Sequence, residues 1–248
     1  MQKLYFLLQN YTLEDALKLE KQDLQYKALE KLYINIEDKN LFLWLIIANS
    51  IVCYQLSSTW EKYWKEFSKS ASDYFLEQIQ GRFPSSRELQ LTQIITFLKV
   101  FLPNSRWNKR LLEVKIKRLE KVEKFISIFL NNIDYYLENL VILRDELAKT
   151  MNQKKDAKTI VFAIKMIMYG ISIIESEIQG RFPTSREWQL INQINIPIDS
   201  RLTKIFEIYK EDYTDIKLFY YDLSEKLEIP EIHLDAILWV NYSNLIQK

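Results

Sequence analysis

Turn-forming residues are scarce along this chain. Its 248 residues include three glycines and five prolines, and no glycine follows an asparagine or an aspartate. Tight β-hairpins depend on such dipeptides, so antiparallel strands would have little turn chemistry to work with. Apolar residues instead recur every three to four positions, which is the period of an amphipathic helix. The sequence therefore predicts an all-α fold.

The periodicity predicts about ten helices joined by short polar breaks. Thr12 followed by Asp15 is typical of a capping box, and Pro230 suits the first turn of the last helix. The apolar run from Leu41 to Leu56 is short for a bilayer span and contains polar residues, so we interpret it as a buried core helix. The expected spans are 12–33, 39–57, 60–80, 86–102, 108–130, 132–149, 157–178, 185–194, 200–227 with a break, and 231–246.

Composition limits the classes of function. The chain is 48% apolar and 14% aromatic, which is ample for a packed core. Its one cysteine, Cys53, excludes an intrachain disulfide, and its one histidine, His233, argues against a His/Cys metal cluster and a Ser-His-Asp triad. The first residues lack the arrangement of a signal peptide. We therefore expect an intracellular protein that has no metal site and does not enter a membrane.

Charge is balanced overall, with 34 basic and 33 acidic residues, but it is segregated along the chain. The segment 99–124 holds nine lysines and arginines and three glutamates, whereas 207–235 holds nine acidic residues and three lysines. Such a basic stripe can present one face to a polyanion. A solvated helix face is an equally good interpretation.

The segment 149–165 carries the most suggestive chemistry. Lys158 stands where a polar turn becomes an apolar helix, and Phe162 and Lys165 follow it at i+4 and i+7. This spacing puts an amine, an aromatic ring and a second cation on one helix face. Taken alone, the spacing fits a solvated lysine and a core phenylalanine better than an active site.

One segment occurs twice. IQGRFPSSRELQL at 79–91 recurs as IQGRFPTSREWQL at 178–190, and the flanking residues do not match. The arginines of the two copies could contact phosphates, but we favour a duplicated surface elbow between helices. These arginines are Arg82, Arg87, Arg181 and Arg186.

Several blocks in a fixed order resemble the archaeal 8-oxoguanine DNA glycosylase/lyases of the helix-hairpin-helix superfamily. The resemblance spans nearly the whole chain outside the two repeated segments. The blocks are LEKQDLQYKAL at 19–29, ANSIVCYQLSSTWEKYWKEF at 48–67, AKTIVFAIKM at 157–166 and IPEIHLDAILW at 229–239, with weaker matches at 101–125 and 194–202.

The resemblance implies one glycosylase unit over 1–248 with its active site in a cleft between two helical subdomains. We expect one subdomain over about 60–150 and the other over 1–59 plus 151–248. The family needs no cofactor. The implied partner is double-stranded DNA containing 8-oxoguanine, with single-stranded DNA left open, and the implied protein is a nucleoid-associated monomer in the cytoplasm.

The same resemblance implies roles for individual residues. Lys158 matches the Schiff-base nucleophile and Asp199 its helping carboxylate. An amine at a helix start is pushed toward its neutral form by the positive helix end and by partial burial, so it can attack a sugar carbon. A nearby carboxylate can stabilise positive charge on the sugar and take a proton.

Base recognition requires flat walls and polar groups that read the base edge. Phe162 and Trp239 match the stacking residues of the family, and Trp64 falls at a further pocket position. The polar matches are Gln25, Lys165 and Asp235. For the DNA backbone we expect contacts from the hairpin lysines Lys154 and Lys155 and from Lys109 and Arg110 of the basic stripe.

Three departures from the family pattern stand out. The hairpin MNQKKDAK lacks the usual glycines, Trp60 replaces a glycine, and Asn195 replaces a proline. The second repeated segment also lengthens the link from Lys158 to Asp199.

Two other functions stay open at this point: a non-catalytic helical nucleic-acid-binding module, and a monofunctional glycosylase for another lesion. The residues do not specify the opposite base or the lesion range.

Overall fold

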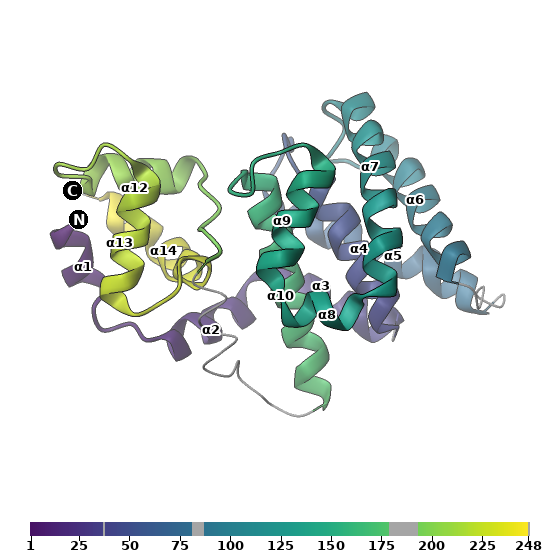
Figure 1. Ribbon diagram of the computed structural model, residues 1–248, viewed down its shortest axis with the longest axis horizontal. Helices are drawn as coiled ribbons and strands as arrows, with labels where there is room; N and C mark the ends of the chain where they lie inside the picture. The colour runs from purple at the N-terminus through teal and green to yellow at the C-terminus, as the bar shows by residue number, and fades with distance from the viewer. Residues whose placement is uncertain (37, 81–86, 179–192, 248) are drawn as a thin grey trace. The chain divides into compact units, whose positions relative to one another are not determined.

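The computed structural model describes residues 1–36, 38–80, 87–178 and 193–247 (Figure 1). All regular secondary structure in these ranges is helical, which confirms the predicted all-α fold. The chain forms two compact units. Unit 1 comprises Met1–Asp23 and Pro183–Lys248, and unit 2 comprises Leu24–Phe182. Unit 2 extends beyond the range of about 60–150 expected for one subdomain, because three further helices pack with the helices of that range: α3 (Leu24–Ile36), α4 (Lys39–Val52) and α10 (Lys158–Ile178).

Unit 1 is built from both ends of the chain, and both termini lie in it (Figure 1). Seventeen buried apolar side chains form its core, among them Leu4, Leu202, Phe219 and Ile237. Its described helices are α1 (Gln2–Leu8), α2 (Leu13–Gln22), α12 (Ser200–Tyr209), α13 (Ile216–Leu227) and α14 (Glu231–Ile246).

Side-chain chemistry fixes two of these helices. The Thr12–Asp15 capping box of α2 is present in both directions, as predicted. The Nδ1 atom of His233 lies 2.9 Å from Glu20 Oε1, so a buried polar pair ties α2 to α14. Pro230 is the residue before α14 and not its first helical residue.

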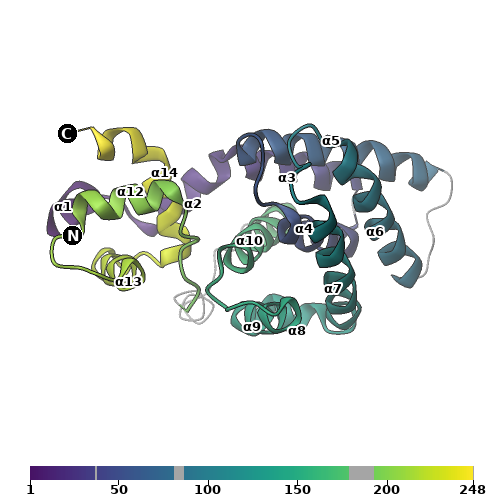
Figure 2. The ribbon, with the colours of Figure 1, turned by 90° about the horizontal axis from the view of Figure 1, so that it is seen from above.

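Unit 2 holds the longer helices. Figure 2 shows α4 surrounded by α3, α7 and α10, and every residue of α4 from Leu41 to Val52 is buried. The predicted core helix is therefore confirmed. The bounds are α3 (Leu24–Ile36), α4 (Lys39–Val52), α5 (Trp60–Gln80), α6 (Arg87–Asn104), α7 (Leu112–Asn131), α8 (Ile133–Glu138), α9 (Leu140–Met151) and α10 (Lys158–Ile178).

A glycine lets α10 approach α4 closely. A Cβ added at Gly170 would lie 2.7 Å from Ile46 Cδ1 and 3.1 Å from Leu43 Cδ2. Close approach of two backbones is one of the uses of glycine inside a helix. One stretch of α10 in the described ranges, Lys158–Ser176, is long and apolar enough to cross a membrane, and 67% of its most apolar window is buried inside the fold. Such burial fits a core helix.

Some helices begin, end or break at residues other than the predicted ones. The expected helix 12–33 is split at Asp23, whose ψ of 132° leaves the helix, and the expected helix 132–149 is split at Asn139. The helix expected to reach 57 ends at Val52. The short α1 was not predicted, and the helix expected at 185–194 lies almost wholly outside the described residues.

Candidate active site

The turn between α9 and α10 presents Lys158. α9 ends at Met151, and its C-cap residue Asn152 has the left-handed conformation (φ 52°) and donates its N–H to Lys149 O at 3.1 Å. Glycine commonly fills this position, and asparagine is the other residue that tolerates it. Asn152 therefore explains how the hairpin forms without glycines. The helix that follows begins at Lys158 itself.

A side-chain latch closes this turn. Gln153 Oε1 accepts hydrogen bonds from Arg118 Nη2 at 2.6 Å and from Thr159 Oγ1 at 3.0 Å. Arg118 Nη2 also donates to Thr159 Oγ1 at 3.2 Å. Arg118 belongs to α7, so that helix holds both sides of the turn and fixes the residue directly after Lys158.

Aromatic rings surround the start of α10. Lys158 Nζ lies 4.9 Å from the centroid of the Trp60 ring. The same ring meets Phe162 edge to face, with centroids 3.9 Å apart and an interplanar angle of 83°. Trp64, which is fully buried, lies 6.3 Å from Phe162 at 60°. The structure thus brings Lys158, Phe162 and Trp64 together and adds Trp60, which the sequence presented only as a departure.

The structure corrects the expected burial of Lys158 and shows what surrounds Lys165. Lys158 is exposed, and not partly buried as we expected. Lys165 is buried, and its Nζ lies 5.5 Å from the Tyr169 ring. Tyr26 packs against that same ring at 5.4 Å. This contact puts the first turn of α3, with buried Gln25, beside the α10 turn that carries Lys165.

The remaining site residues lie in unit 1. Asp199 is the N-cap of α12, and its Oδ1 accepts from the N–H groups of Arg201 at 2.9 Å and Leu202 at 3.0 Å. The Arg201 guanidinium carbon lies 3.0 Å from the centroid of the Trp239 ring. Asp235 is half-buried one helical turn before Trp239 on α14.

The buried phenol of Tyr220 lies near both candidate site carboxylates, those of Asp199 and Asp235. Tyr220 donates its O–H to Leu202 O at 2.6 Å. Burial raises the pKa of Tyr220, and the negative charges of Asp199 and Asp235 raise that pKa further. Both carboxylates are therefore within electrostatic reach of one side chain. Sequence reasoning had no signal for Tyr220, since its spacing from either aspartate follows no helical period.

A buried glutamate anchors the segment that leads to Asp199. Glu231 accepts hydrogen bonds from Asn195 Nδ2 and from the N–H of Ile196, each at 3.1 Å. Burial raises the pKa of Glu231 to about 7. The amide of Asn195 thus has a partner that a proline could not bind. Sequence reasoning missed Glu231, which looked like one more acid of the acidic segment.

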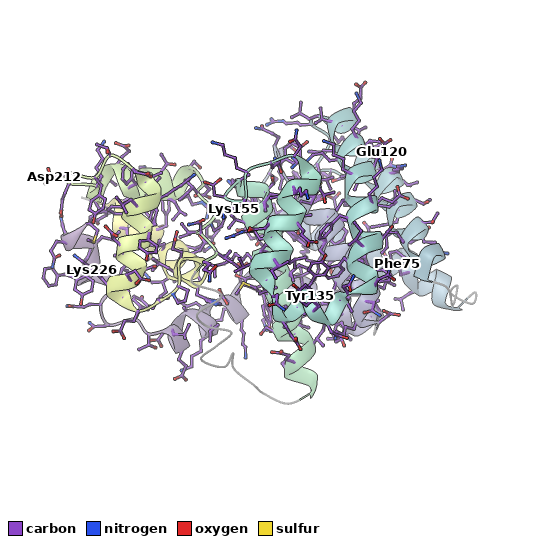
Figure 3. The ribbon with its side chains drawn as sticks, in the orientation of Figure 1. Phe75, Glu120, Tyr135, Lys155, Asp212 and Lys226 are labelled. Atoms are coloured by element: carbon purple, nitrogen blue, oxygen red, sulfur yellow. The ribbon has the colours of Figure 1, made fainter. Side chains whose placement is uncertain are left out.

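The basic stripe of 99–124 is divided by the fold. Lys109 and Arg110 are exposed, as are the hairpin lysines Lys154 and Lys155. Lys155, marked in Figure 3, lies in the turn before α10, 4.0 Å from Asp145. These four positions fit contacts to a polyanion.

Lys115 departs from the expectation for the stripe, most of whose other cations are exposed. It is fully buried, donates from Nζ to Asn108 Oδ1, and lies 4.9 Å from the Tyr54 ring centroid. Burial lowers the pKa of Lys115 to about 8. Lys115 is a core cation, and Arg118 serves the latch. The arginine side chains of the two repeated segments lie outside the described residues.

A solved structure has a similar fold. The crystal structure of Pa-AGOG, the 8-oxoguanine DNA glycosylase of Pyrobaculum aerophilum, complexed with 8-oxoguanosine, matches with a TM-score of 0.70 and 22% identity. The match covers 97% of this chain and 86% of that one. The chain therefore has the same all-helical fold as Pa-AGOG.

Similar sequences identify the family. The N-glycosylase/DNA lyase of Thermococcus kodakarensis is 39% identical over 224 residues, which make up 89% of this chain and 75% of that relative. The corresponding protein of Methanococcus maripaludis is 38% identical, with coverage of 89% and 78%. The family model described as AGOG: N-glycosylase/DNA lyase matches residues 6–248. The chain belongs to the AGOG family of N-glycosylase/DNA lyases.

Membership confirms the resemblance drawn from the sequence. The chain is a bifunctional glycosylase/lyase of base-excision DNA repair. This decides against the two alternatives, a non-catalytic binding module and a monofunctional glycosylase. The matched range 6–248 includes residues of both units, so the family assignment extends to the elements that carry Lys158 and to those that carry Asp199.

Proposed function

We propose that this glycosylase/lyase removes 8-oxoguanine from double-stranded DNA, with Lys158 as the nucleophile and Asp199 as its acid/base partner. The observation that carries the proposal is the start of α10, where Lys158 and Phe162 contact the same indole ring, that of Trp60. The latched hairpin holds Lys158 in this position. An amine, a stacking ring and a rigid turn are what a lysine-dependent glycosylase needs.

The chemistry proceeds through one covalent intermediate. The Lys158 amine attacks C1′ of the deoxyribose, the bond from C1′ to the base nitrogen breaks, and the base leaves with the electron pair and gains a proton. Loss of the amine proton and ring opening give the Schiff base. Removal of a C2′ proton then breaks the C3′–O bond, so that the strand on the 3′ side leaves with a 5′ phosphate. Hydrolysis of the Schiff base frees the amine and completes the lyase step.

Asp199 supports this chemistry through charge. Its Oδ1 is engaged as the cap of α12, so we assign the chemical role to Oδ2. A carboxylate stabilises the positive charge that develops on the sugar as the base leaves, and it can take the proton lost by the amine. The two capping N–H groups hold the carboxylate in one orientation.

Further residues would recognise the base. Phe162 and Trp64 would form the aromatic wall of the pocket in unit 2, and the exposed ring of Trp239 would stack on the base from unit 1. Gln25 and Lys165 would hydrogen-bond the edge of the base, and Asp235 would accept its N–H groups. A site built to bind specific N–H groups rejects a base that lacks them far more strongly than a hydrophobic slot does. The N7 hydrogen of 8-oxoguanine, which guanine lacks, suits a carboxylate acceptor.

Sequence-independent contacts would come from exposed cations. We assign Lys154, Lys155, Lys109 and Arg110 to phosphates of the DNA. We further propose that the protein acts as a monomer, that it works in the cytoplasm at the nucleoid, and that single-stranded DNA containing the lesion is a weaker substrate.

Base release from defined duplexes tests the lesion assignment. Duplexes with one 8-oxoguanine or with guanine at the same position are compared under single-turnover conditions for wild type, Asp235→Asn and the control Asp212→Asn, whose side chain is exposed on the same unit. We expect wild type and the control to release 8-oxoguanine and not guanine, and Asp235→Asn to be at least tenfold slower. Release of both bases at equal rates would refute the assignment.

A further inference from the structure

Phe162 has no face open to a base. Its side chain is 3% exposed, and two tryptophan rings contact it. A base that stacks between two ring faces needs a gap of roughly 7 Å, twice the ~3.5 Å contact distance of carbon atoms. The Trp60 centroid lies 3.9 Å from that of Phe162 with the rings nearly perpendicular. An extruded base can therefore stack on Phe162 only after a ring has moved.

Of the two rings, Trp60 is the one placed to move. Trp64 is fully buried in the second turn of α5 and packs edge to face on Phe67 at 5.4 Å. Trp60 is half-buried and is the first residue of α5. The loop before it has a left-handed residue, Gln55, with φ 51°. A side chain at a helix start has fewer neighbours to displace than one in the middle of a packed helix.

Trp60 also contacts the nucleophile. Its ring centroid lies 4.9 Å from Lys158 Nζ, within the range of a cation–π interaction. This interaction favours the charged amine, which is not nucleophilic. Movement of the indole would remove that stabilisation at the moment when a base takes its place.

We propose that Trp60 is a displaceable plug, which occupies the stacking position on Phe162 in the free enzyme and leaves it, together with the Lys158 amine, when the extruded base enters. The proposal rests on the roles given above to Phe162 and Lys158. It makes Trp60 a specificity residue, because a base must compete with the indole for Phe162. A base with extra polar contacts, such as 8-oxoguanine, does so better than guanine.

The test compares two substrates that differ in the need for base entry. Single-turnover rates and half-saturation concentrations are measured for wild type, Trp60→Gly and Trp60→Phe on an 8-oxoguanine duplex and on a duplex with a preformed abasic site. The lyase step on the abasic duplex requires no base to enter. Its rate also reports whether each variant is folded and retains its amine chemistry.

We expect Trp60→Gly to lower the half-saturation concentration for the 8-oxoguanine duplex by about threefold to tenfold, since removing a competing closed state raises the fraction of enzyme competent to bind. The half-saturation concentration for the abasic duplex should stay within about twofold, because no base has to displace the indole there. The abasic lyase rate should not fall, since loss of the ring removes a contact that favours the charged amine. Release of undamaged guanine should become measurable. Trp60→Phe should lie between wild type and Trp60→Gly.

Other results would overturn the plug. Slower release of 8-oxoguanine by Trp60→Gly, with the abasic reaction intact, would make Trp60 a wall of the pocket. Equal shifts on both duplexes would make it a structural residue. Failure of the proposed function is recognised separately: wild type would then act on neither duplex, or Lys158→Gln would keep the abasic reaction.

Discussion

At the scale of single residues, the helix period predicted some neighbours and could not predict others. Lys158 and Phe162 lie on one face because a four-residue separation in a helix fixes that relation. Trp60 meets them through side-chain contacts between the first residue of α5 and the start of α10, which no periodicity encodes. Its separation of four residues from Trp64 was the available signal, since that spacing puts both indoles on one face of α5.

Whether a charged side chain is exposed or buried decides its role, and the sequence alone does not show which it is. Lys115 belongs to the basic stripe by sequence and to the core by structure. The direction in which a helical side chain points depends on which face the neighbouring helices cover, and in α7 apolar and basic residues alternate too closely to decide it. Glu231 is hidden among acids in the same way.

Glu231 makes stability depend on pH. Its folded pKa of about 7 lies above the ordinary 4.5, so the folded state binds more protons than the unfolded state between these values, and stability falls as pH rises through that window. At about 1.4 kcal/mol per pKa unit, the loss is up to about 3 kcal/mol. Glu231→Gln, which does not ionise, should remove this dependence.

Urea unfolding at pH 5 and pH 8 measures this pH dependence of the free energy of unfolding. We expect the wild type to lose more stability than Glu231→Gln between the two pH values, with the difference confined to the range below about pH 8. Parallel loss in both proteins would show that Glu231 is not the titrating group.

At the scale of elements, the hairpin before α10 shows what local chemistry controls. Periodicity predicted α9 and α10, and the polar stretch between them predicted a turn. The latch of Gln153, Arg118 and Thr159 depends on α7, which lies far away in sequence. Breaks such as Asp23 escaped prediction because a one-residue interruption leaves the apolar repeat nearly in phase on its two sides.

The packing of α10 on α4 gives a prediction at this scale. Gly170→Val should destabilise the protein by about 1–3 kcal/mol, because its side chain would overlap Ile46 and Leu43. Gly170→Ala is the matched control: the atoms it meets are ends of flexible side chains, and alanine favours a helix by about 1 kcal/mol over glycine. Thermal unfolding compares the two. An equal effect of Val and Ala would contradict close packing at this position.

At the scale of the whole molecule, the proposed catalysis draws on residues of both units. Lys158 belongs to unit 2, and Asp199 is carried by the segment 183–248 of unit 1. The sequence predicted both residues through the resemblance, and the fold class through the scarcity of turn residues. The limits of the compact units depend on long-range packing between helices, which no local pattern of the sequence encodes.

DNA binding should depend on the hairpin lysines. Replacing Lys154 and Lys155 together by alanine should reduce the slope of log affinity against log salt by roughly two, since each phosphate contact contributes about 0.9. A matched pair of exposed lysines in the acidic segment of unit 1, Lys217 and Lys226, should leave the slope unchanged. Fluorescence anisotropy measures the affinity for a labelled duplex from about 50 to about 200 mM salt, and so gives the slope for each variant. An unchanged slope for the hairpin variant would move the DNA face elsewhere.

Borohydride trapping tests the central claim most directly. Wild type, Lys158→Gln and the exposed-lysine control Lys226→Gln are each mixed with an 8-oxoguanine duplex or an undamaged duplex and then reduced. We predict a covalent protein–DNA adduct for wild type and Lys226→Gln on the damaged duplex, none on the undamaged one, and none for Lys158→Gln although it still binds the DNA. An adduct formed by Lys158→Gln would contradict the assignment of Lys158 as the nucleophile.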